Sequence, residues 1–170
     1  MFDKLNPMAA VERPDLLADV TFAALQYVPQ ARVFEIDPEH SDTETLCRVY
    51  GLPLEAMANA VLVVGKREGV QRQACAMTLA HRRVDVNGVV KRRLNVRKAS
   101  FAPMDYATQA SGMEYGGITP VGLGPDWPVW VDESVVATEV VCIGAGVRRA
   151  KLLLPGASLL RLPGAELVDG

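Results

Sequence analysis

The chain has 170 residues, of which 49% are hydrophobic, and its net charge is -2. This length is enough for one hydrophobic core and short for two domains. No apolar run approaches the roughly 18 residues of a membrane span, and the start MFDKLNPMAAVERPD lacks a secretory signal pattern, so we expect a cytoplasmic protein with no membrane partner.

The N-terminal part of the chain predicts two helices separated by a strand. Residues 14–29 begin and end with proline and place apolar side chains on one face of a helix. These side chains are Leu16, Leu17, Val20, Ala24 and Tyr27. A strand is predicted over residues 31–37. Ser41 stands three residues before Glu44, which is the spacing of a capping box, so a short helix is predicted from there to Gly51.

The rest of the chain predicts a mixture of strands and short helices. Two apolar runs, residues 59–64 and 73–79, are joined by a polar turn at Glu68 and Gly69, which is typical of a β-hairpin. Helices are then predicted at residues 85–96, 102–111 and 156–162, and strands at 96–100, 128–132, 139–146, 150–154 and 165–169. This pattern predicts a mixed α+β fold, with a curled mixed β-sheet or open barrel surrounded by short helices.

The charge of the chain is unevenly distributed. Ten of its 18 basic residues but only two of its 20 acidic residues lie between Lys66 and Lys98, so this segment carries +8 and the remainder -10. The candidate tRNA-binding residues in it are Arg82, Arg83, Lys91, Arg92, Arg93, Arg97 and Lys98. Either this is a solvated basic surface, or it binds a nucleic acid or another polyanion.

The cysteines and histidines do not form a metal-binding pattern. Cys47, Cys75 and Cys142 are odd in number, far apart and set among apolar neighbours, which favours buried reduced thiols. His40 and His81 are the only histidines, and their spacing builds no zinc cluster. We therefore expect no metal and no cofactor.

Three segments carry a family resemblance. GGITPVGL (116–123), VWVDESV (129–135) and VCIGAGVRRAKLLL (141–154) occur in this order, and GAELVD follows them. Together they resemble the YbaK and prolyl-tRNA-synthetase-associated editing-domain family. The resemblance divides the chain into an N-terminal helical extension, residues 1–30, and an editing domain, residues 31–170.

The resemblance implies a trans-acting deacylase that hydrolyses the ester of a mischarged tRNA. Mischarged tRNA is then the expected partner, and an aminoacyl-tRNA synthetase remains open as another. A synthetase pocket separates similar side chains by only about 1–3 kcal/mol per methylene, so a second hydrolytic site is needed. The alternatives are a non-catalytic member that binds aminoacyl-tRNA, tRNA or a synthetase, and a pocket re-used for an unrelated small molecule.

The resemblance also assigns candidate site residues. Gly116 and Gly117 would contact the ester, because backbone N–H groups without a Cβ can approach and stabilise an oxyanion; the alternative is a turn that needs glycine for its backbone angles alone. The resemblance places further substrate-binding residues at Ile118, Thr119, Pro120, Asp132, Ser134, Gly144, Gly146 and Arg148. For Asp132, a loop or helix-capping hydrogen bond explains the carboxylate equally well.

One position departs from the family. Family members carry a lysine on the first strand of the hairpin, where it contacts the acceptor end of the tRNA, and Asn59 occupies that position here. Asparagine can donate a hydrogen bond, but it lacks the charge that strengthens such a bond by about 1 kcal/mol. Asn59 therefore either changes substrate choice or anchoring in an active site, or marks a protein that binds without hydrolysis.

Overall fold

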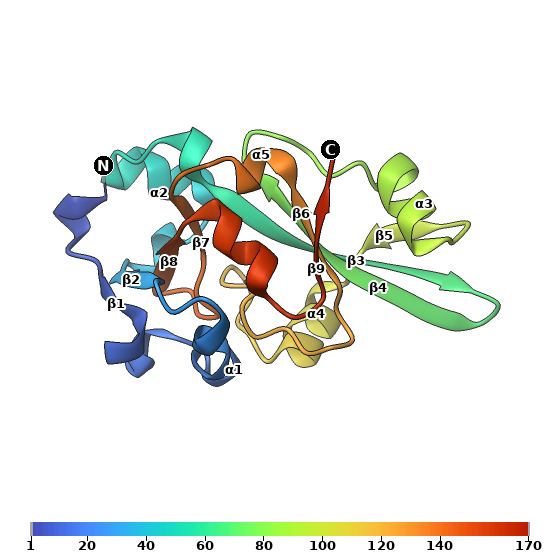
Figure 1. Ribbon diagram of the computed structural model, residues 1–170, viewed down its shortest axis with the longest axis horizontal. Coiled ribbons are helices and arrows are strands. Elements are labelled where there is room, and N and C mark those ends of the chain that lie inside the picture. Colours follow the sequence, from blue (N-terminus) through green and yellow to red (C-terminus); the bar gives the residue numbers. More distant parts are fainter. Residues whose placement is uncertain (1, 170) are drawn as a thin grey trace.

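The computed structural model describes residues 2–169, and these form two β-sheets with short helices around them (Figure 1). The strands are β1 Met8–Ala9, β2 Arg32–Glu35, β3 Ala58–Arg67, β4 Val70–Leu79, β5 Ala99–Phe101, β6 Val129–Asp132, β7 Val141–Gly144, β8 Ala150–Leu154 and β9 Ala165–Val168. One sheet has the order β1-β2-β8-β7 and the other the order β5-β3-β4-β6-β9.

The helices are short. The α-helices are α1 Asp19–Ala23, α2 Thr43–Tyr50, α3 Lys91–Leu94, α4 Met104–Ser111 and α5 Glu133–Val136. The 3-10 helices are Asp3–Leu5, Ala10–Glu12, Pro14–Leu16, Ala24–Tyr27, Pro38–His40, Leu54–Ala56 and Gly156–Arg161, and a π-helical turn, Val86–Val90, precedes α3. Among residues 2–169, no helix combines the length and apolar character that crossing a membrane requires.

The sheets confirm the predicted mixed α+β class and correct its details. Strand pairs β4–β6 and β6–β9 are parallel, whereas the other pairs are antiparallel. The single curled sheet or barrel that was predicted is instead two sheets, and within residues 2–169 they do not close into a barrel. A parallel bridge between Met57 and Cys142 links them just before β3.

The predicted hairpin is confirmed and is longer than the apolar runs indicated. β3 and β4 pair without interruption from Ala58 with Leu79 to Arg67 with Val70. Glu68 and Gly69 connect them with φ values of 51° and 80°. Two consecutive positive φ values match the right-handed twist of a tight hairpin, which explains the glycine at the second position.

The prediction of one continuous N-terminal helix over residues 14–29 is wrong. The structure has a 3-10 helix, then α1, then a second 3-10 helix, and the break falls at Leu17, whose backbone is extended (φ -132°, ψ 148°). The next residue, Ala18, donates its N–H to the carbonyl of Ala145 at 3.2 Å. This tertiary contact turns the chain, so Val20 and Tyr27 are exposed whereas Leu16 is buried.

The next helix, α2, confirms the prediction except at its first turn. Asp42, not Ser41, caps it, because the Asp42 carboxylate accepts a hydrogen bond from the Thr45 N–H at 3.0 Å. Gly51 ends the helix with a left-handed φ of 64°. Ser41 does not cap the helix. Its side chain is buried and accepts a hydrogen bond from Arg148.

The C-terminal half follows the predicted order with two differences. The predicted segment at 156–162 is a 3-10 helix, and α5, which directly follows β6, was not predicted. The five-stranded sheet separates two groups of helices, with α3 on one side and α4 on the other (Figure 1). Side chains alternate along β3 accordingly: Leu62 joins the main core with Ala107 of α4, whereas Val63 packs with Leu94 of α3.

Candidate active site

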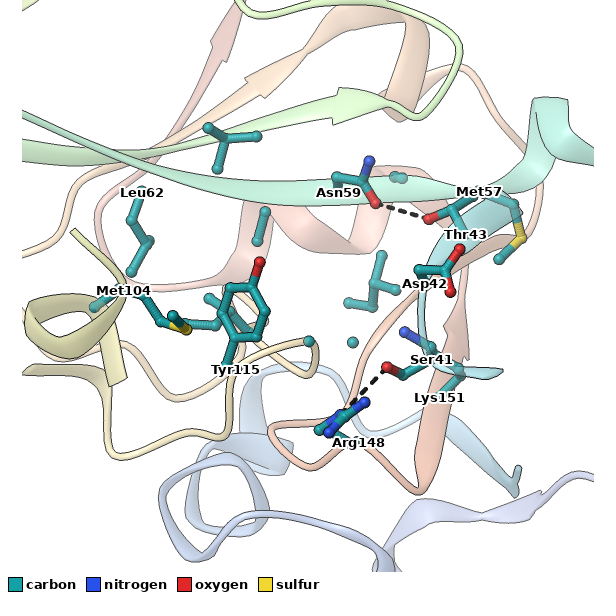
Figure 2. Close-up of a pocket in the computed structure, with 18 of the residues that line it drawn as sticks. Ser41, Asp42, Thr43, Met57, Asn59, Leu62, Met104, Tyr115, Arg148 and Lys151 are labelled. Atoms are coloured by element: carbon teal, nitrogen blue, oxygen red, sulfur yellow. Dashed lines mark hydrogen bonds between the residues drawn. The ribbon is translucent and has the colours of Figure 1, made fainter. Parts of the chain in front are cut away.

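A pocket of about 630 Å³ lies beside the N-terminal half of β3 (Figure 2). β5 pairs with β3 only from Val63 to Gly65, so the preceding residues of β3 border the pocket with their edge. The opposite wall comes from α2, α4, β7 and the loop after α4. The pocket thus joins segments that are distant in the sequence.

One end of the pocket is polar and is built on the start of α2. Asn59 accepts a hydrogen bond from the Thr43 hydroxyl at 3.2 Å, so its carboxamide oxygen is held at the wall. Asp42 lies beside them, and its capping bond to Thr45 lowers the pKa of its carboxyl group. Position 59 therefore faces the pocket, which is where the resemblance expects the family lysine, but it carries no charge.

Lys151 brings a charge to the same end of the pocket from β8. Its side chain is 7% exposed, and Figure 2 shows it extending from β8 toward Ser41 and Asp42. Among residues 2–169, none of the hydrogen bonds or ion pairs involves its ammonium group. Burial lowers its pKa, and the nearby Cys142 and Asp42 offset only part of this effect.

The other end of the pocket is apolar and opens to solvent. Leu62 and Ala107 form its inner part, and three large side chains lie at its mouth. These are Phe101, Met104 and Tyr115, which are 61%, 56% and 62% exposed. Figure 2 shows Tyr115 projecting between the apolar and the polar ends. Exposed side chains of this kind give a flat apolar or aromatic group something to stack on.

The two glycines at 116 and 117 occupy different environments. Gly116 lines the pocket, has a φ of 86° and is exposed. Gly117 is buried and lies outside the pocket lining; its N–H donates to the carbonyl of Glu114 at 3.0 Å. A Cβ on Gly117 would meet the Val147 backbone at 2.6 Å. The structure thus brings Gly116, and not Gly117, to the candidate site.

The predicted glycines 144 and 146 pack against this loop. A Cβ on Gly144 would lie 2.5 Å from the carbonyl oxygen of Ile118, so this close approach requires glycine. Gly146 donates its N–H to the carbonyl of Gly117 at 2.7 Å and has a φ of 85°. Gly144 and Ile118 line the pocket, whereas Gly146 supports it from behind.

Arg148 lines the pocket and is held in place by the protein. Its guanidinium donates to the Ser41 hydroxyl at 3.4 Å and to the Pro38 carbonyl at 3.1 Å, and its backbone N–H donates to the Glu114 carboxylate at 2.7 Å. A second, more open hollow of about 520 Å³ shares Arg148 and Tyr115 with the pocket. Arg148 therefore borders both hollows.

The remaining predicted substrate-binding residues lie outside the pocket lining. Asp132 caps α5, where its carboxylate accepts hydrogen bonds from the Ser134 N–H at 2.8 Å and from the Ser134 hydroxyl. Thr119 and Pro120 are buried behind the glycine loop. These contacts agree with the capping alternative for Asp132, and they place all four residues in the supporting structure.

The basic segment packs on the other side of the five-stranded sheet. Val90, Leu94 and Val96 fix the π-helical turn and α3 against that face, and most of the predicted basic side chains around them are exposed. Lys91 is half-buried, and Arg93 pairs with Glu166 at 2.9 Å and covers the Trp130 ring at 5.6 Å. Arg82 lies 3.9 Å from Asp132. The pocket lining therefore does not include the exposed candidates Arg83, Arg92, Arg97 and Lys98.

Cysteine chemistry plays no visible part in the pocket. Cys142 lines it but is buried, and burial raises the pKa of the Cys142 and Cys75 thiols to about 12. Cys47 also has a raised pKa because it is partly buried. Among residues 2–169, no group of three or more histidine, cysteine, aspartate or glutamate side chains is arranged to hold a metal ion.

Several pocket residues were missed by the sequence reasoning. Lys151 gave a detectable signal, because it is the charged residue in the otherwise apolar strand AKLLL. Asp42 and Thr43 were assigned only to a helix start. Phe101 and Met104 carry no recognisable motif, so their place at the pocket mouth depends on how β5 and α4 pack.

The sequence pattern of the aminoacyl-tRNA editing domain family matches residues 37–162, which is most of the chain. The chain therefore belongs to this family, as the three resembling segments predicted. No curated protein sequence matches it.

Solved structures share the fold at low sequence identity. A candidate trans-editing enzyme for prolyl tRNA synthetase is 21% identical with a TM-score of 0.75, over 89% of this chain and 94% of that one. The hypothetical protein APE2540 is 16% identical with a TM-score of 0.77, over 89% of this chain and 98% of that one. At these identities the likeness shows a common fold, and the chemistry must be argued from the pocket.

Proposed function

We propose that this protein acts in trans as a deacylase that hydrolyses the ester of a mischarged tRNA. The observation that carries the proposal is the two-ended pocket, in which exposed apolar side chains at the mouth lead to a polar end lined by Gly116. Its volume lies within the range of about 300–1,000 Å³ that is typical of small-molecule sites. The terminal adenosine of a tRNA, with its aminoacyl ester, is a group of this class.

The two ends of the pocket suit the two parts of that group. The adenine ring would stack among Phe101, Met104 and Tyr115, as bases commonly stack on exposed aromatic side chains. The aminoacyl ester would then reach the polar end beside Asn59 and Gly116. Hydrolysis passes through a tetrahedral oxyanion, which backbone N–H groups can stabilise without an acidic side chain.

The alternative is a family member that binds aminoacyl-tRNA or a synthetase without hydrolysis. Asn59 favours it, because the family lysine is replaced by a neutral side chain that is hydrogen-bonded to Thr43. The pocket lining and the glycine loop are common to both proposals. The two proposals differ only in whether the bound ester is hydrolysed.

Release of labelled amino acid from mischarged tRNA tests the proposal directly. The panel is tRNA charged with alanine, cysteine, serine or threonine, and correctly charged tRNA is the control. We expect faster release than the spontaneous rate from at least one mischarged tRNA. Binding without release would select the non-catalytic alternative, and neither binding nor release from any tRNA would contradict both.

A further inference from the structure

We infer that Lys151 is a catalytic residue of this pocket, where its ammonium group binds the carbonyl oxygen of the aminoacyl ester and stabilises the oxyanion. The inference rests on the proposed deacylase function and deepens it. It concerns a residue on β8, far in the sequence from the position at which the resemblance expects a lysine.

The ammonium group of Lys151 has no partner among residues 2–169. Lys151 is 7% exposed, and no hydrogen bond or ion pair among residues 2–169 satisfies its ammonium group. Asp42 is the acidic residue beside it, but that carboxylate caps α2 and does not form an ion pair with it. Burial of an unpaired charge is costly unless a partner enters the site. Among residues 2–169, Lys151 Nζ is not one of the fully buried polar atoms that lack a partner, so it faces the pocket, where a strongly polar atom of the substrate can replace water beside it.

The ammonium group of Lys151 lies where the ester is expected to bind. Under the proposed function, the aminoacyl ester reaches the polar end of the pocket, because the adenine ring stacks at the apolar end. Lys151 lies at that polar end, and Figure 2 shows it directed toward Ser41. A Cβ on Gly116 would lie 3.1 Å from the Ser41 hydroxyl, so the Gly116 backbone borders the same spot. Lys151 and Gly116 therefore flank one place for the ester carbonyl.

The reaction then balances without a cofactor. Water attacks the carbonyl carbon, a new C–O bond forms, and the carbonyl electron pair moves to the oxygen beside the Lys151 ammonium. Collapse of this intermediate breaks the bond to the ribose oxygen, which takes a proton that the water supplied. The amino acid leaves as a carboxylate, and the other proton goes to solvent. A cation at the oxyanion lowers this barrier more than it strengthens ground-state binding.

The test compares Lys151→Met with wild type and with Lys4→Met, which changes an exposed lysine outside both the pocket lining and the basic segment. Methionine keeps the aliphatic length of the side chain but removes the charge. We expect kcat to fall by about 100–1,000-fold with KM within about threefold of wild type, as when an oxyanion donor is removed. Lys4→Met should match wild type, and the melting temperature of Lys151→Met should not fall.

Three results would overturn the inference. An unchanged kcat removes Lys151 from the reaction, and a raised KM with unchanged kcat assigns it to binding of the phosphate or ribose. The third comes from the pH profile of wild type, which also serves if Lys151→Met does not fold. A rate that falls as the lysine deprotonates supports the inference, whereas a rate that rises over the same range shows a neutral amine acting as a base. If the wild-type protein releases no amino acid, this result contradicts the proposed function itself, and it is obtained before any variant is made.

Discussion

The N–H of Gly146 donates a hydrogen bond to the carbonyl of Gly117 at 2.7 Å. Two glycine-containing segments, which the sequence presents as separate motifs, therefore hold one another by their backbones. Gly144 fits against the carbonyl oxygen of Ile118 in the same contact. Gly116 and Gly117 therefore have different roles. Gly117 supports the loop, and Gly116 faces the pocket.

The first prediction separates these two glycines. Gly116→Ala should lower the deacylation rate at least tenfold, because its Cβ would enter the space beside Ser41, and should cost about 1–2 kcal/mol of stability at a φ of 86°. Gly164→Ala is the matched control, since Gly164 has a φ of 75° and lies outside the pocket lining. It should lose similar stability and keep its activity. Thermal melting and single-turnover hydrolysis measure both.

Gly117 should behave differently from Gly116. A side chain there would meet the Val147 backbone at 2.6 Å, so Gly117→Ala should destabilise the fold by about 3 kcal/mol or more. Loss of activity in that variant would then report unfolding. A stable Gly117→Ala protein with wild-type melting would show that this packing is looser than the structure indicates.

The second prediction concerns stability and pH. Burial lowers the pKa of Lys151 below its ordinary value of 10.5, so the unfolded chain binds this proton more tightly than the folded one. Between the two pKa values stability gains with rising pH, and below both the full cost of burying the cation is present. The groups that act on it are Asp42 and Cys142, and Arg148 lines the same pocket.

Lys151→Met should remove this dependence. We expect the variant to be at least as stable as wild type at neutral pH, and the difference to shrink as pH rises toward 10.5. Chemical denaturation of both proteins at several alkaline pH values provides the measurement. A difference that stays constant with pH would mean that the folded-state pKa is not lowered.

The third prediction concerns Asn59→Lys, whose effect on activity should be opposite in wild type and in the Lys151→Met variant. In wild type, Asn59→Lys should lower activity a few-fold, because it breaks the bond to Thr43 and a second cation in the pocket lowers the pKa of Lys151 further. In Lys151→Met, the same change should raise activity a few-fold to tens-fold, because the pocket regains a cation worth about 1–2 kcal/mol. Asn59→Met is the uncharged control. Equal effects in both backgrounds would show that the two positions act independently.

The fourth prediction concerns the basic segment, which we propose contacts tRNA. Arg92 is exposed, and Arg92→Glu should weaken tRNA binding and reduce the slope of log K against log salt by about 1. Arg161→Glu is the control, because Arg161 is an exposed arginine outside this segment. Arg93 is less suitable, since it pairs with Glu166 and covers Trp130. An unchanged salt slope in Arg92→Glu would remove this face from tRNA binding.

The sequence predicted elements well where local chemistry decides the conformation. The turn at Glu68 and Gly69 and the glycine end of α2 follow from backbone preferences, so they were found correctly. The N-terminal helix was wrong because a long-range hydrogen bond from Ala18 overrides its helical pattern. The second sheet was missed because strand order depends on contacts between distant segments.

The candidate site was predictable only where a motif marks it. Gly116, Gly144 and Asn59 were expected there and line the pocket. Asp132 also lies in one of the three resembling segments, but its carboxylate caps α5, which spacing alone cannot distinguish from a substrate contact. Lys151 was missed because the sequence shows only a lysine within an apolar strand. The fold is needed to show that this lysine is buried and that β8 borders a cavity.

Residues 2–30 lie outside the part of the chain that matches the family, but several of their side chains pack in the main core. Leu16, Leu17, Leu25 and Val28 are buried in the main core, and β1 extends the four-stranded sheet beside β2. The segment that marks the protein as an editing domain is therefore smaller than the unit that folds. A fragment cut at residue 37 would keep the recognisable motifs but expose the apolar surface that these leucines now cover.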